Sequence, residues 1–178
     1  MKVLDNFLTK SESNTLKDYF FDNKFEWYYQ KNILDETDTK ENRMGFAHTF
    51  MMSGKIKSKR YDVVKMISDK VNYHLNYDLT PFNVRSFLQI PLNKKLYKKP
   101  EDKPHTDITD KHTVYLYYIN DCDGDTIIYD NDKNIVNRIT PKQGRIIIFD
   151  GKTYHSSSQP TKGPRAVINY NMVWDLTI

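Results

Sequence analysis

The chain has 178 residues, and 28% of them are charged. Its formal net charge is +4 at neutral pH, and it contains one cysteine. A single cysteine excludes an internal disulfide and suits a reducing compartment. The length predicts one domain, residues 1–178, and the lack of an apolar leader or of a long apolar run makes the cytoplasm the expected location.

Residues 1–80 are expected to form a helical support region. Thr9 and Glu12 supply capping chemistry for a first helix, whose apolar side chains recur at helical spacing. A second amphipathic helix is expected from about residue 58 to residue 75. Both helices are predicted to pack against the outside of a sheet. The segment 30–57 between them is polar, without a clear period, and is interpreted as a substrate-covering loop or as ordinary surface.

Residues 81–178 contain short strand-like runs separated by Asp, Asn, Gly and Pro clusters. This pattern is typical of a β-sandwich or barrel, and no crossover helix is expected between the runs. The runs are Val84 to Pro91, Thr113 to Asn120, Thr126 to Tyr129, Ile135 to Ile139, Arg145 to Phe149 and Ala166 to Trp174. The expected class is therefore mainly β with flanking helices.

Three residues in the strand-rich part are candidate metal ligands. If residues 105–107 are extended, His105 and Asp107 project from the same face and can share one metal. His155 follows the apolar run that ends at Phe149, where it could reach back into a barrel mouth. Two histidines and one carboxylate leave one face of an octahedral iron(II) open. Taken singly, each residue could instead be an ordinary polar loop residue, and His112 is a weaker candidate.

Arg165 opens the last strand-like run. An arginine that faces a barrel interior is costly unless it meets an anion, and its planar fork suits a carboxylate. Residues 165, 167, 169 and 171 share one face, so Asn169 and Asn171 are expected to point into the same cavity. By itself, an arginine at this position is more often a strand-end residue in solvent. The occurrence of all four residues in this order favours the buried site.

As a set, these motifs resemble the catalytic domain of the iron(II) and 2-oxoglutarate dependent oxygenases, most closely the prolyl 4-hydroxylase type. The resemblance covers about residues 83–174, roughly half of the chain. The residues that carry it are His105-Thr106-Asp107, Leu116-Tyr117-Tyr118-Ile119-Asn120, Gly124-Asp125-Thr126, the stretch from Thr140 to Phe149, His155 and Arg165.

The resemblance implies a double-stranded β-helix, a jelly-roll or cupin-like barrel buttressed by the N-terminal helices. It implies that His105, Asp107 and His155 bind Fe(2+), and that Arg165 pairs with the distal carboxylate of 2-oxoglutarate. The implied enzyme is an oxidoreductase, a dioxygenase that uses O2 to hydroxylate a substrate C–H bond and releases succinate and CO2. Ascorbate is a candidate accessory reductant.

The resemblance also assigns residues to the cosubstrate pocket. Tyr118 matches a tyrosine that hydrogen-bonds the same carboxylate, although a slip of one register would substitute Tyr117 or Tyr115. Leu116 shares the face of Tyr118, and Asn169 shares that of Arg165, so both are assigned to cosubstrate binding.

Partners are less determined by the sequence. The resemblance suggests peptidyl proline, but a protein, peptide or small-molecule substrate fits equally, and the rim segments 30–57 and 93–104 are expected to decide. Nucleic acid is not favoured, because position 171 is asparagine where nucleic-acid demethylating relatives have a second arginine. A non-catalytic jelly-roll protein that binds a metal or ligand is the alternative. The sequence gives no indication of oligomeric state.

Overall fold

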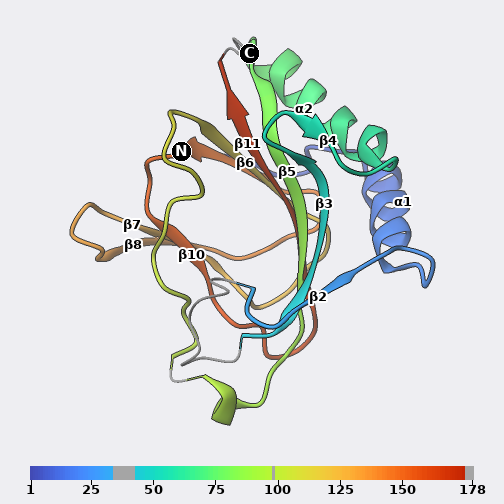
Figure 1. Cartoon of the computed structure of the whole chain (residues 1–178). Coiled ribbons are helices and arrows are strands. Elements are labelled where there is room, and N and C mark those ends of the chain that lie inside the picture. The colour runs from blue at the N-terminus through green and yellow to red at the C-terminus, as the bar shows by residue number, and fades with distance from the viewer. Residues whose placement is uncertain (34–42, 98, 175–178) are drawn as a thin grey trace.

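The computed structural model describes residues 1–33, 43–97 and 99–174. Two antiparallel sheets face each other, and both helices lie on the far side of the larger one (Figure 1). The larger sheet has eight strands, ordered Lys2–Leu4 (β1), Ile146–Asp150 (β9), Thr113–Tyr118 (β6), Arg165–Val173 (β11), Thr80–Gln89 (β5), Gly45–Met52 (β3) and Tyr28–Gln30 (β2), with Lys55–Ile56 (β4) paired to β3.

The smaller sheet has three strands, ordered His155–Ser157 (β10), Thr126–Tyr129 (β7) and Ile135–Ile139 (β8). Isolated bridges join Glu101 to Ser158 and His105 to His155, so the chain around residues 101–105 lies along the outer edge of β10. A short 3-10 helix, Lys94–Leu96, precedes this segment. This arrangement confirms the expected mainly β jelly-roll, and β7 and β8 have the predicted bounds.

The two helices occupy the expected places. Helix α1, Lys10–Phe21, begins with a complete capping box in which Thr9 and Glu12 bond each other's backbone N–H. Helix α2, Tyr61–Leu75, begins three residues later than expected and ends at Asn76 in the left-handed conformation. Both helices pack on the outer face of the large sheet, in a cluster that includes Phe20, Val64, Ile67, Ile168 and Tyr170.

Alternation along the strands separates this outer core from an inner face. The inner face of the large sheet looks toward the small sheet and carries a second apolar cluster, with Val114, Leu116, Tyr118, Ile147, Phe149 and Val167 among its members. Polar residues lie on the same face, because the register places Asn169 of β11 opposite Leu116 of β6 on one side and Arg85 of β5 on the other. The inner face is therefore where a polar site can form between two apolar walls.

The interpretation of 30–57 as a loop is wrong for its second half. Residues 45–52 form β3, which pairs with β5 and extends the large sheet, and residues 34–42 lie outside the described residues. Most β3 residues are buried, and the buried positions are not confined to alternate residues, so the run lacks the period of two that marks a half-buried strand. The expected helical support region, residues 1–80, also contributes strands β1 to β4 to the large sheet. Residue 80 therefore does not separate a helical part of the chain from the sheet.

Candidate metal centre

Three side chains from two neighbouring extended segments converge between the sheets. His105 and His155 are paired across the bridge, and each donates its backbone N–H to the carbonyl of the other at 3.0 Å. Asp107 follows two residues after His105, so both side chains point to the same side of the extended segment, as predicted. One ligand atom from each of the three residues can be chosen so that all lie within 4.8 Å of one another.

Backbone carbonyls orient both imidazole rings. Nδ1 of His105 lies 3.1 Å from the carbonyl of Lys103, and Nδ1 of His155 lies 3.0 Å from that of Thr153. A carbonyl can only accept, so each Nδ1 carries a proton, and a ring in its neutral form then keeps on Nε2 the lone pair that binds a metal. The Nε2 atoms lie 3.8 Å and 3.5 Å from Oδ1 of Asp107. Such second contacts fix the ring orientation of metal-binding histidines in general.

Two asparagines hold the other oxygen of Asp107. Its Oδ2 accepts from Nδ2 of Asn169 at 3.0 Å and from Nδ2 of Asn171 at 2.6 Å, which leaves Oδ1 to face the histidines. Asn83 donates in turn to Oδ1 of Asn171 at 3.5 Å. Asn169 thus faces the cavity as predicted, but its amide nitrogen binds Asp107, while its role toward a cosubstrate stays a prediction.

The electrostatics of the cluster favour an ionised carboxylate at Asp107. Burial opposes ionisation of Asp107, but hydrogen bonding and attraction from His155 when its ring is protonated, with the Asn169 amide, hold the pKa of Asp107 well below the usual value. Burial, together with His155, lowers the pKa of His105. Deprotonated carboxylate and imidazole are the forms that bind metals. The donors therefore fit the two-histidine, one-carboxylate set that iron(II) oxygenases use.

Arg165 lies deeper between the sheets, and side chains and backbone of the protein hold it in place. Nε donates to the carbonyl of Gly124 at 2.9 Å, one terminal nitrogen to Oε1 of Gln89 at 3.2 Å, and the other to Oγ1 of Thr126 at 2.8 Å. A guanidinium has five N–H groups, so each terminal nitrogen retains one more donor. The pair of remaining donors suits a carboxylate.

Tyr118 lies behind Arg165, away from the cavity wall formed by the described residues. Its hydroxyl donates to Oγ1 of Thr126 at 2.8 Å, its ring centroid is 6.0 Å from the guanidinium carbon, and burial raises its pKa to about 12. Leu116 lines the cavity, whereas Tyr117 and Tyr115, the alternatives to Tyr118, face the outer core. The face expected for Tyr118 is confirmed, and its bond to a cosubstrate stays a prediction.

The three candidate ligands, Asn169 and Arg165 line one cavity of about 370 Å³, within the size range of small-molecule sites. Both sheets and the segment before β6 contribute to its wall. The lining residues are Ile33, Arg85, Phe87, Gln89, His105, Thr106, Asp107, Val114, Leu116, Thr126, Phe149, His155, Ser156, Ser157, Arg165, Val167 and Asn169. The buried Oδ1 of Asn169 has no hydrogen-bond partner among the described residues. An unpaired acceptor in this position is a polar group available to an occupant of the cavity.

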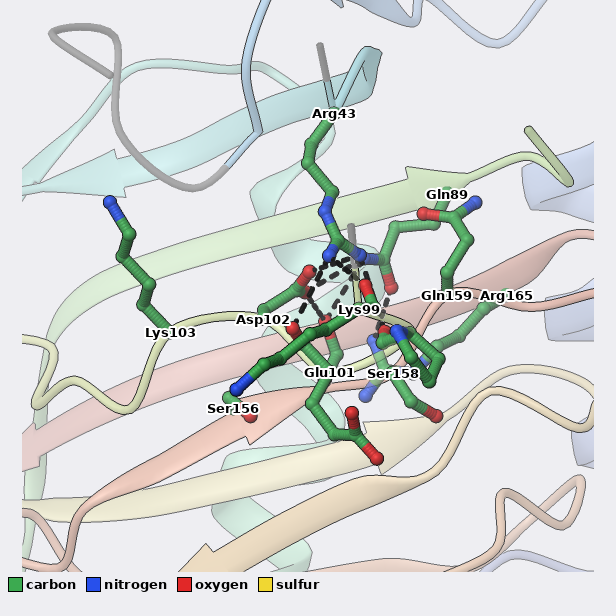
Figure 2. A network of polar contacts seen from close by, with 12 residues as sticks. Arg43, Gln89, Lys99, Glu101, Asp102, Lys103, Ser156, Ser158, Gln159 and Arg165 are labelled. Carbon is green, nitrogen blue, oxygen red and sulfur yellow. Dashed lines mark hydrogen bonds and ion pairs between the residues drawn. The ribbon is translucent and has the colours of Figure 1, made fainter. Parts of the chain in front are cut away.

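A buried ion pair fixes the segment that leads to His105 (Figure 2). Nη1 of Arg43 lies 2.8 Å from Oδ1 of Asp102, and both side chains are almost wholly buried. The guanidinium also donates to three backbone carbonyls, those of Lys99, Pro100 and Glu101. Because it joins the start of β3 to the metal-binding segment, Arg43 restricts where His105 can lie.

Gln89 connects this ion pair to Arg165. Its Nε2 donates to Oγ of Ser157 at 2.9 Å and to Oδ2 of Asp102 at 3.4 Å, while its Oε1 accepts from Arg165. Ser157, two residues after His155, also donates to Asp102. One hydrogen-bond network therefore positions both the histidine segments and the arginine.

Several of these residues were missed in the sequence. Arg43 stood in a stretch interpreted as a loop, and Asp102 in a lysine-rich run that is typical of solvated surface. Gln89 and Arg85 alternate with Phe87 in β5, so strand periodicity could have placed them on the inner face. His112, the weaker ligand candidate, is buried away from the cluster and bonds the carbonyl of Asp110 at 2.7 Å.

None of the helices in the described part of the chain is both long and apolar enough to cross a bilayer.

Comparisons with known proteins agree with this geometry. A profile of the 2OG-Fe(II) oxygenase superfamily matches residues 94–173, which include both histidines, Asp107 and Arg165. A search of curated protein sequences finds no significant match.

Three solved structures share the fold. A viral collagen prolyl hydroxylase from Paramecium bursaria Chlorella virus-1, in its 2OG complex, is 16% identical, with a TM-score of 0.60 over 96% of this chain and 93% of that one. A prolyl hydroxylase from Trichoplax adhaerens, bound to a hypoxia inducible factor peptide, is 17% identical (TM-score 0.65, 97% and 83% covered). A prolyl-4-hydroxylase from Pseudomonas putida is 14% identical (TM-score 0.64, 98% and 92% covered).

Proposed function

Because residues 94–173 match a profile of the 2OG-Fe(II) oxygenase superfamily, we propose that the cavity of this chain hydroxylates a C–H bond of a substrate at an iron(II) ion held by His105, Asp107 and His155. The convergence of these three donors carries the proposal. Iron(II) and 2-oxoglutarate are the metal and cosubstrate of this superfamily. In the reaction, one oxygen atom of O2 enters the substrate as a hydroxyl and the other enters succinate, with loss of CO2.

The residues of this chain have separate tasks in that reaction. Arg165 binds the distal carboxylate of 2-oxoglutarate, because each of its terminal nitrogens retains one donor and the residue lines the cavity. Asn169 and Asn171 hold Asp107 so that one oxygen faces the metal. Leu116 and Val167 form an apolar wall that limits access of water to the reacting atoms. When bound, iron(II) would supply the site at which O2, the oxidant, is activated, and 2-oxoglutarate would supply two of the electrons that reduce O2, chemistry that these side chains lack.

The substrate class is drawn from the prolyl hydroxylase neighbours. Peptidyl proline is the first candidate, since the Trichoplax enzyme holds a peptide in its structure. A free small molecule is the second, because the cavity volume is ample for one. We propose that residues 1–178 act as one oxygenase unit in either case.

The test measures metal binding and turnover separately. Anaerobic addition of iron(II) and 2-oxoglutarate should produce a weak visible charge-transfer band, and air with substrate should then give succinate and a product heavier by one oxygen atom. Arg165→Gln should weaken 2-oxoglutarate binding, whereas Lys55→Gln, which removes an exposed charge on β4, should not. A band without succinate release, in a screen of peptides and metabolites, would favour the non-catalytic binding protein.

A further inference from the structure

A second arginine faces the same cavity and has no task in the reaction described above. Arg85 lies in β5 opposite Asn169 of β11, and it lines the cavity together with Phe87 and Gln89 of its own strand. Side chains two apart in a strand share a face, so these three residues point toward the small sheet. Arg85 therefore stands next to the asparagine that holds Asp107.

The contacts of Arg85 leave its donors free. Its guanidinium carbon is 5.1 Å from the centroid of the Phe87 ring, and it is attracted to the charge of Asp107. To the residues that the structure describes, Arg85 donates no side-chain hydrogen bond and forms no ion pair. Burial lowers the pKa of Arg85, the sign of a cation that has lost part of its hydration. A cation in this state is costly unless an anion reaches it.

Arg165 differs from Arg85 in its hydrogen bonds and in its position along the strands. Arg165 makes three hydrogen bonds to the protein, and it lies opposite Gln89, four residues along β5 from Arg85. That offset corresponds to about 13 Å along the strands. The two arginines therefore lie at opposite ends of the cavity, Arg165 at the deep end and Arg85 beside the metal ligands. Two such distant cations suit two different anions.

The balance of charges in the cavity also favours an anion at Arg85. Among the described residues that line the cavity, the carboxylate and guanidinium groups are those of Asp107, Arg85 and Arg165. The charges of iron(II) and of 2-oxoglutarate cancel, and Arg165 cancels Asp107. Arg85 then leaves one positive charge uncompensated in the cavity. Asp107 cannot neutralise Arg85 once iron(II) and 2-oxoglutarate are bound, because its carboxylate is then a metal ligand.

We propose that Arg85 binds a carboxylate of the primary substrate and so selects an acidic compound or peptide as the molecule to be hydroxylated. This inference rests on the proposed function of the cavity and specifies its substrate class. The carboxylate would lie beside the metal ligands, which brings the neighbouring carbon atoms of the substrate toward the iron. A free amino acid and an acidic residue next to the reacting one in a peptide offer the same group.

The experiment compares matched acids and amides on the intact protein. Loaded anaerobically with iron(II) and 2-oxoglutarate, the protein is titrated with L-amino acids and their α-carboxamides. A second arm uses acetylated, amidated tetrapeptides in which glutamate or glutamine adjoins proline. The shift of the visible charge-transfer band gives a dissociation constant for each probe, and succinate release in air gives turnover.

We expect acids in at least one arm to bind at least about thirtyfold more tightly than their amides, as for a buried charge pair with one partner removed. A response to free acids identifies a small-molecule substrate, and a response to glutamate peptides alone identifies an acidic peptide. Arg85→Gln should abolish the preference, Arg85→Lys should keep part of it, and Lys55→Gln should leave it unchanged.

Four results would overturn the inference. Acids and amides could act alike on the unaltered protein, or no probe in either arm could shift the band. Arg85→Gln could keep the preference while it forms the band normally. Arg85→Gln could also lose the band, which would place Arg85 in the 2-oxoglutarate site. The comparison on the unaltered protein holds even if a variant fails to fold. Absence of the band from the unaltered protein contradicts instead the proposed function.

Discussion

The two faces of the large sheet are made by the same strands and bury different groups. Along β11, Ala166, Ile168, Tyr170 and Met172 pack toward the helices, whereas Arg165, Val167, Asn169 and Asn171 lie on the inner face, where all but Asn171 line the cavity. All eight side chains are less than one tenth exposed. Burial alone therefore does not distinguish the core from the site. The difference lies in hydrogen bonding, since the polar residues of the inner face bind one another and Asp107.

This comparison has an energetic consequence. The outer face contributes apolar area and close packing, which stabilise the fold in proportion to the area buried. The inner face keeps polar groups in low dielectric, where each must be paired or it lowers stability. We therefore expect changes on the outer face to alter the free energy of unfolding, and changes on the inner face to alter metal binding and turnover.

The largest effect is expected from the carboxylate ligand. Asp107→Ala should reduce succinate release to the level of solution without enzyme, because a site with two histidines alone holds iron(II) weakly. Bound iron and succinate are measured on the purified variant. Asp132→Ala, in the exposed turn between β7 and β8, should behave like the unaltered protein. Normal iron content and turnover in Asp107→Ala would contradict the site.

On the outer face, Ile168→Ala should lower the free energy of unfolding by about 2–5 kcal/mol, because it leaves a cavity in the core between the sheet and the helices. Urea unfolding followed by circular dichroism measures the change. Turnover per folded molecule should stay as it was. Val136→Ala, more than half exposed in β8, should change stability by less than about 0.5 kcal/mol. Equal losses of unfolding free energy from Ile168→Ala and Val136→Ala would show that packing on the outer face is not what stabilises the fold.

A smaller effect is expected one contact away from the metal. Asn171→Ala removes the 2.6 Å bond to Asp107 and should weaken iron affinity or turnover by about 10–100-fold, as for other partners of metal ligands. Titration with iron(II) under anaerobic conditions measures the affinity. Asn83→Ala acts one bond further out and should cost less. If Asn83→Ala proved the more harmful of the two, the proposed order of contacts would be wrong.

The smallest effect belongs to an ion pair outside both faces. Arg145 donates to Asp5 at 2.5 Å and 3.0 Å, and this hydrogen bonding lowers the pKa of Asp5. A lowered pKa in the folded state stabilises the fold above the unfolded value of about 4, and the gain disappears as the pH falls through the lower folded value. Asp5→Asn should therefore cost less than about 1 kcal/mol at pH 7 and nothing in strong acid.

Urea unfolding at neutral and acidic pH measures this difference between the unaltered protein and Asp5→Asn. A cost that is the same at both pH values would show that the ion pair is not its origin.

Local sequence signals predicted the elements that have clear local patterns. The capping box of Thr9 and Glu12 and the bounds of β7 and β8 follow from the residues themselves. The pattern failed for β3, whose buried positions do not alternate, and for β10, which has only three residues. Neither strand forms without its neighbours, so its own sequence carries little trace of it.

The sequence by itself determined which donors are available, in what order, and which residues of β11 share a face, because these follow from residue identity and from the period of two in a strand. Only the tertiary structure decided that Asn169 and Asn171 hold Asp107, that Gln89 joins Arg165 to Asp102, and that Tyr118 lies behind the cavity wall. A hydrogen bond between distant segments depends on strand register and on how two sheets pack, and neither is encoded within one short stretch of chain.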